Sequence, residues 1–110
     1  MTHITLYKYS DEETYIGFRS EGHAEFDDVG KDIVCAALSV LTINTMNSIE
    51  SLTNDKFVQR IDEDNAVMEF LVTSEVISNE ANVLLKSMVL GLKMILESNP
   101  SHVSITIEEV

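Results

Sequence analysis

The first of two helical patterns in the chain reads GKDIVCAALSVLTINTMNSIESL, residues 30–52. Apolar residues recur in it every three or four positions, which predicts an amphipathic helix. The row that we expect to meet a sheet comprises Val34, Ala37, Leu38, Leu41, Ile49 and Leu52. A second apolar row on the far side comprises Ile33, Ala36, Val40 and Ile43. A helix that is apolar on two faces is buried on both, so we expect the preceding loop or another subunit to cover the second row.

Five other stretches alternate apolar and polar residues in the manner of β-strands: 3–9, 15–20, 57–61, 66–72 and 103–107. Ser78 is expected to cap a second helix that ends near Asn99, before Pro100. The resulting order is β-β-α-β-β-α-β, and we predict a single domain over residues 1–110. The two short hairpins favour an α+β fold, a two-layer sandwich in which both helices pack on one face of an antiparallel or mixed sheet.

The chain is strongly acidic, with 19 Asp and Glu against 7 Lys and Arg in 110 residues and a formal net charge of −12. Nucleic acids and anionic membranes require a basic surface, so we expect no direct contact with nucleic acid and no membrane binding. The acidity suits a basic protein partner, or it serves plain solubility. No stretch approaches the ~18 apolar residues of a membrane span or the apolar run of a signal peptide. A single cysteine indicates a reducing compartment, and we expect the protein in the cytoplasm.

Cys35 and His23 form the candidate catalytic pair. The thiolate is the nucleophilic form of cysteine, and a nearby imidazole or helix N-terminus favours it. The polar loop 21–29, with Gly22 and Gly30 as hinges, is long enough to bring His23 back over the helix start. We expect this loop to be poorly ordered until it closes over Cys35 when substrate binds. The alternative is a structural cysteine, because free cysteine is among the most buried residue types.

Asp32 and Ser39 lie three residues before and four residues after Cys35, so their side chains can neighbour it on a helix. A carboxylate beside a thiolate would disfavour the charged form, so Asp32 is better suited to orienting His23 or to stabilising the helix N-terminus. Ser39 can hydrogen-bond substrate or the carbonyl of the preceding turn. One cysteine and three scattered histidines provide no metal-binding spacing, and no glycine-rich phosphate loop occurs. We therefore expect no metal and no cofactor.

The motif Gly22-His23-Ala24, followed by GKDIVCAA at 30–37 and Ser39, closely resembles the paired motifs of the ribosomal-processing cysteine protease family, Prp. The resemblance covers essentially the whole chain, including LLKSMVLGLK at 84–93. It implies a cysteine endopeptidase in which His23 is the general base and Cys35 the nucleophile, with Asp32 and Ser39 in supporting positions.

The same resemblance implies a substrate and an assembly. Family members remove an N-terminal extension from a bacterial large-subunit ribosomal protein, cleave after an aromatic residue, and are homodimers. The acidic composition and the second apolar row on the first helix are compatible with a basic substrate and a dimer. The remaining alternative is a non-enzymatic ribosome-associated factor that binds a basic ribosomal protein and in which Cys35 is structural.

Overall fold

The computed structural model describes residues 1–10, 13–22 and 29–110, apart from the side chains of residues 29–32. Along the chain the elements are β1 (Thr2–Lys8), β2 (Tyr15–Glu21), α1 (Val29–Leu52), β3 (Phe57–Asp62), β4 (Val67–Val72), α2 (Asn79–Ser98) and β5 (Val103–Glu109). This confirms the order β-β-α-β-β-α-β expected from the sequence. The ends of the helices and strands lie close to the expected positions. The small differences that remain are of the size usual for element ends.

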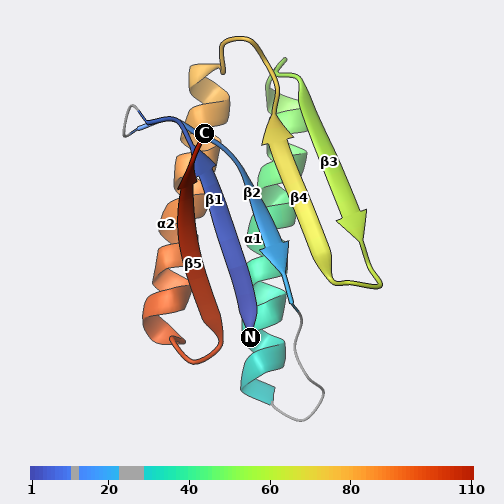
Figure 1. Ribbon diagram of the computed structural model, residues 1–110, viewed down its shortest axis with the longest axis vertical. Coiled ribbons are helices and arrows are strands. Elements are labelled where there is room, and N and C mark those ends of the chain that lie inside the picture. Colours follow the sequence, from blue (N-terminus) through green and yellow to red (C-terminus); the bar gives the residue numbers. More distant parts are fainter. Residues whose placement is uncertain (11–12, 23–28) are drawn as a thin grey trace.

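Within the described residues, the strands form one mixed sheet in the order β3-β4-β2-β1-β5 (Figure 1). The pairs β1–β2, β2–β4 and β3–β4 are antiparallel, whereas β1 and β5 run parallel. The β1–β2 and β3–β4 pairs are hairpins, because a short turn reverses the chain, whereas the parallel partner β5 follows the helix α2. Both helices lie on the same face of the sheet (Figure 1), which confirms the predicted two-layer α+β sandwich.

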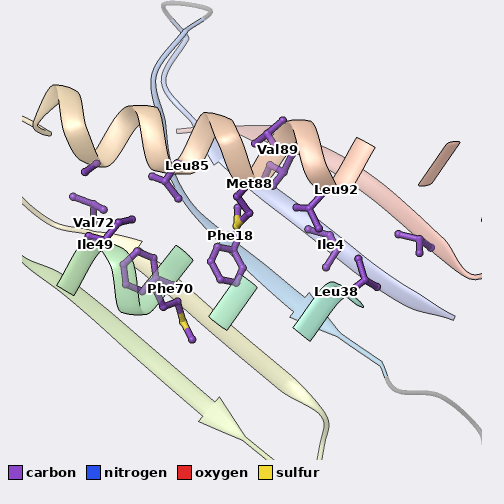
Figure 2. Packing of buried hydrophobic residues seen from close by; sticks show 14 of the residues in the cluster. Ile4, Phe18, Leu38, Ile49, Phe70, Val72, Leu85, Met88, Val89 and Leu92 are labelled. Carbon is purple, nitrogen blue, oxygen red and sulfur yellow. The ribbon is translucent and has the colours of Figure 1, made fainter. Parts of the chain in front are cut away.

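The core lies between the sheet and the two helices (Figure 2). Phe18 of β2 and Phe70 of β4 are fully buried and stack with their ring centroids 6.0 Å apart. Phe57 of the edge strand β3 packs against Phe70 at 5.1 Å. From the helices, Ile49 and Leu85 close the layer and are also fully buried. Every second strand residue points into this layer, so the sheet presents an apolar face to the two helices.

The buried face of α1 differs from the one predicted. The helix buries Val34, Leu38, Thr42, Thr45, Met46 and Ile49, whereas Ala37 and Leu52 are exposed, Leu52 by 70%. Two threonines occupy the core face because their hydroxyls need no partner outside the helix. Thr42 donates to the carbonyl of Leu38 and Thr45 to that of Leu41, each at 2.8 Å. A buried polar group that is hydrogen-bonded in this way is tolerated.

The second apolar row of α1 faces outward. Ile33 is 65% exposed, Val40 70% and Ile43 43%, and Ala36 is exposed as well. By length and mean hydropathy, the segment Ile33–Leu52 meets the criteria for a membrane-spanning helix, so the expectation that no stretch approaches such a span is wrong. One side of this segment lies in the core described above. Its apolar character therefore reflects two separate surfaces, the core face and an uncovered outer face.

The start of α2 follows its predicted signal. Ser78 adopts an extended conformation and its hydroxyl accepts a hydrogen bond from the N–H of Ala81 at 3.1 Å, as an N-cap residue does. Asn99 ends the helix, and its N–H donates to the carbonyls of Ile95 and Leu96. In the middle of α2, Gly91 allows close contact with α1, since a Cβ there would lie 2.6 Å from a methyl carbon of Leu41.

Candidate active site

Cys35 lies six positions after Val29, the first residue of α1, and is half-buried. It is therefore beyond the four free N–H groups that begin a helix, and the favourable effect of the helix dipole falls off within the first turn. The polar contact of the sulfur comes instead from the sheet. The hydroxyl oxygen Oγ1 of Thr2, in β1, lies 3.4 Å from Sγ of Cys35. A fully buried structural cysteine, the alternative considered from the sequence, does not fit this partly accessible position.

The sulfur opens into a small pocket of about 90 Å³, built from three strands and one helix. Its described lining consists of Thr2 from β1, Ser20 from β2, Gly22, Met68 from β4, and Cys35, Leu38, Ser39 and Thr42 from α1. Three of the residues expected at the site, Gly22, Cys35 and Ser39, thus line one pocket.

Gly22 has a conformation that only glycine adopts readily. Its φ is +95°, and a Cβ at this position would lie 2.5 Å from the carbonyl oxygen of Met1. Its N–H donates to the carbonyl oxygen of Ala66 at 3.1 Å. The chain therefore leaves β2 in close contact with the start of β1, beside the residue whose hydroxyl contacts Cys35. This is a structural reason for glycine at the position predicted to be a loop hinge.

The structure places the other predicted residues only in part. His23 lies outside the described residues, as does the rest of segment 23–28, so the expected His23–Cys35 contact and the expected loop closure are untested. Asp32 lies in the first turn of α1, but its side chain is not among those described. Gly30 is the second residue of α1, so it lies inside the helix and does not border a loop that ends at residue 29. Ser39 is exposed at the rim of the pocket.

Thr2 was not identified as a site residue from the sequence, although a signal for it was present. Thr2, Ile4 and Leu6 alternate at the spacing of a strand, and all three are buried on the side that faces the helices. The predicted strand began at His3, so Thr2 was left out of the series of alternating buried residues. Its closeness to Cys35, 33 positions later in the chain, depends on how α1 packs against β1.

The two histidines that the structure describes lie outside this pocket. His3 is half-buried, with Nδ1 2.5 Å from the Ser104 hydroxyl and Nε2 3.3 Å from that of Thr106. His102 is half-buried too, and its buried Nδ1 has no hydrogen-bond partner among the described residues. Within the described ranges, no group of three or more His, Cys, Asp or Glu side chains is arranged to hold a metal ion.

A larger hollow of about 720 Å³ lies beside the last residue of α1, roughly 25 Å along the helix from Cys35. One of its charged groups is Asp55, whose carboxylate accepts hydrogen bonds from the Ser74 hydroxyl at 3.0 Å and from the backbone N–H and hydroxyl of Ser78. Burial by itself raises the pKa of Asp55, but the hydrogen bonds from Ser78 and Ser74 outweigh it and hold the pKa below its usual value. These contacts join the start of α2 to the end of α1, so this hollow has a structural role.

Comparison with known proteins identifies the family. The family model described as cysteine protease Prp matches residues 1–104 of the chain. The chain belongs to the Prp cysteine protease family. The curated ribosomal processing cysteine protease Prp of two Staphylococcus aureus strains is 31% identical to it over 77 residues, which cover 70% of this chain and 72% of that protein. The family assignment made from the motifs around His23 and Cys35 is thereby confirmed.

Several solved structures share the fold of this chain. The S. aureus Prp protease in complex with a substrate peptide superposes with a TM-score of 0.87 at 22% identity, covering 98% of this chain and 100% of that one. The same protease with a covalently linked product peptide gives a TM-score of 0.85 at 23% identity and the same coverage. A Streptococcus mutans protein gives 0.85 at 25% identity, covering 100% of this chain and 96% of that one. This Prp family cysteine protease therefore has the Prp fold throughout.

Proposed function

We propose that this cysteine protease removes an N-terminal extension from a bacterial large-subunit ribosomal protein, with Cys35 as the nucleophile and His23 as the general base. The observation that carries the proposal is the pocket that Cys35 lines together with Gly22, the residue immediately before His23. The curated S. aureus relatives are named ribosomal processing proteases, which supports a ribosomal protein as the substrate.

The reaction follows from the chemistry of a thiol and an imidazole. His23 accepts the proton of the Cys35 thiol, and the thiolate attacks the carbonyl carbon of the scissile peptide bond. The protonated His23 then donates this proton to the leaving amine, and the remaining acyl group stays on the sulfur as a thioester. A water molecule, deprotonated by His23, hydrolyses the thioester and restores the free thiol.

Asp32 and Ser39 are proposed as supporting residues. Asp32, in the first turn of α1, would orient His23 and hold the imidazole in the tautomer that accepts a proton from sulfur. Ser39, exposed at the rim of the Cys35 pocket, would hydrogen-bond the backbone of a bound substrate. Gly22, through its positive φ, would allow the segment that follows it to close over the peptide.

The charge of the protein supports a basic substrate. A net charge of −12 attracts ribosomal proteins, which are basic because they bind RNA, and repels nucleic acid itself. We propose cleavage after an aromatic residue of the extension. We also propose action in the cytoplasm, where ribosomal proteins are made and where a lone thiol stays reduced.

The outer apolar face supports a homodimer. The row comprises Ile33, Ala36, Val40 and Ile43, all exposed. Two of its members, Ala36 and Val40, line a groove of about 580 Å³ between α1 and α2, together with Leu41 and Met94. Exposed aliphatic rows of this kind mark interaction surfaces. A second copy that packs the same face against this one would bury the row in a symmetric interface.

The proposal is tested by incubating the protein with peptides that span the N-termini of large-subunit ribosomal protein precursors and identifying the products by mass spectrometry. We expect a single cut after an aromatic residue, no cut by Cys35→Ser or Cys35→Ala, and a severe loss of activity in His23→Ala. Circular dichroism of each variant controls for folding. Cleavage by Cys35→Ala at the wild-type rate would overturn the nucleophile assignment.

A further inference from the structure

Thr2 is the described residue whose side chain makes a polar contact with the candidate nucleophile. Its Oγ1 lies 3.4 Å from Sγ of Cys35, and the residue is only 4% exposed. Among the described residues, the hydroxyl of Thr2 has no other hydrogen-bond partner, so its proton is available to the sulfur.

The sheet holds this hydroxyl in place. The backbone N–H of Thr2 donates to the carbonyl oxygen of His102 at 3.0 Å, and Thr2 pairs with Val103 in the parallel ladder. On the other side, Gly22 is so near that a Cβ there would lie 2.5 Å from the carbonyl oxygen of Met1 and 3.5 Å from the Cα of Thr2. Threonine is also stiff at χ1 because its Cβ is branched. The direction of the hydroxyl is therefore set by the backbone on both sides.

Two other polar side chains of the pocket, on α1, are less suited to this role. The hydroxyl of Thr42 donates to the carbonyl of Leu38 at 2.8 Å, within its own helix, and Ser39 is exposed at the rim. Apart from Cys35, no described residue that lines the pocket, on any of the four elements around it, carries a titratable or charged side chain. Among the described residues, the hydroxyl of Thr2 is therefore the polar group placed to act on the sulfur.

We propose that Thr2 is a positioning residue for the Cys35 nucleophile, and this inference rests on the proposed function of Cys35. A thiolate can only accept a hydrogen bond, so the hydroxyl of Thr2 donates to it, and a bond to an ionised acceptor is stronger than one to a neutral thiol. The contact therefore favours the thiolate over the thiol. It also holds the sulfur in one orientation toward the pocket, where it can attack the carbonyl carbon of the scissile peptide bond.

The test compares three variants with the wild type by measuring the rate of iodoacetamide alkylation of Cys35 as a function of pH. Thr2→Val keeps the branched shape and removes the hydroxyl, whereas Thr2→Ser keeps the hydroxyl. Thr45→Val is the matched control, because Thr45 is also a buried threonine but donates to the carbonyl of Leu41 and does not line the pocket. Thermal unfolding of each variant shows whether it is folded.

We expect the midpoint of the pH–rate profile to rise by about one pH unit in Thr2→Val, so that alkylation near pH 7 slows about tenfold. That shift corresponds to about 1.4 kcal/mol. Thr2→Ser and Thr45→Val should keep the wild-type midpoint. A wild-type midpoint in folded Thr2→Val, or an equal shift in Thr45→Val, would overturn the inference. If Thr2→Val fails to fold, Thr2→Ser provides the test instead. A changed midpoint of the pH–rate profile in Thr2→Ser would then contradict the inference.

The same series separates this inference from the proposed function. Suppose that cleavage requires Cys35 but that Thr2→Val keeps the wild-type midpoint of alkylation. The protease assignment would then stand, and the proposed role of Thr2 would be wrong. A shifted midpoint in a protein that cuts no ribosomal precursor would support the Thr2–Cys35 coupling and count against the proposed substrate.

Discussion

Replacing Gly22 with alanine tests whether the close contact between the end of β2 and the start of β1 supports the site. The added Cβ would lie 2.5 Å from the carbonyl oxygen of Met1, whereas ordinary contacts begin at 3.4 Å. The oxygen belongs to the backbone and cannot rotate away as a side chain can. The start of β1 must therefore retreat by nearly 1 Å, and Thr2 must move with it.

Two costs add up in this variant. A residue other than glycine at φ +95° is strained, and a left-handed conformation costs about 1–2 kcal/mol. With the displacement of Met1, we expect a loss of roughly 2 kcal/mol in the free energy of unfolding. For a domain of this size, this loss corresponds to a decrease of ~8 °C in the midpoint of thermal unfolding. Because a misplacement of about 1 Å near reacting groups can cost about a hundredfold in rate, peptide cleavage should fall by about that factor.

The matched control is Gly91→Ala. Its Cβ would also be too close to a neighbour, at 2.6 Å, but the neighbour is a methyl group of Leu41 that can rotate away. Alanine is also favoured over glycine in a helix by about 1 kcal/mol, so this variant should have nearly wild-type stability and activity. Thermal unfolding gives the stability, and peptide cleavage is measured well below the unfolding midpoint. If Gly22→Ala is as stable and active as Gly91→Ala, the reasoning is refuted.

Three further predictions concern stability and assembly. Leu85→Ala should cost about 2–5 kcal/mol in urea unfolding, because Leu85 is fully buried between helix and sheet, and a loss below about 1 kcal/mol would contradict the packing described. Since the folded pKa of Asp55 is lowered, its stabilising contribution is full above about pH 4 and is lost as the pH falls through that pKa. Asp55→Asn should therefore destabilise the protein more at pH 7 than at pH 3, and an equal loss at both would speak against this. Val40→Glu places a charge on the outer face of α1 and should give a monomer by sedimentation, where the wild type is expected to be a dimer. A wild type that is already monomeric at micromolar concentration would remove the dimer proposal.

The sequence by itself determined the elements and their order, because the signals are local. Alternation with a period of two marks the strands, and spacing of three or four marks the helices. Ser78 caps α2 as predicted, since an N-cap bond spans only a few residues. The motif residues around His23 and Cys35 were sufficient to assign the family, which the match over residues 1–104 confirms.

Only the tertiary structure decided which side of α1 enters the core and what Cys35 touches. The prediction placed Ala37 and Leu52 inside, but the structure buries Thr42 and Thr45, whose hydroxyls are satisfied within the helix. The parallel pairing of β1 with β5 likewise joins residues about a hundred positions apart. Thr2 meets Cys35 because α1 packs across β1 at that point, and such contacts depend on how whole elements pack, which no local pattern of residues encodes.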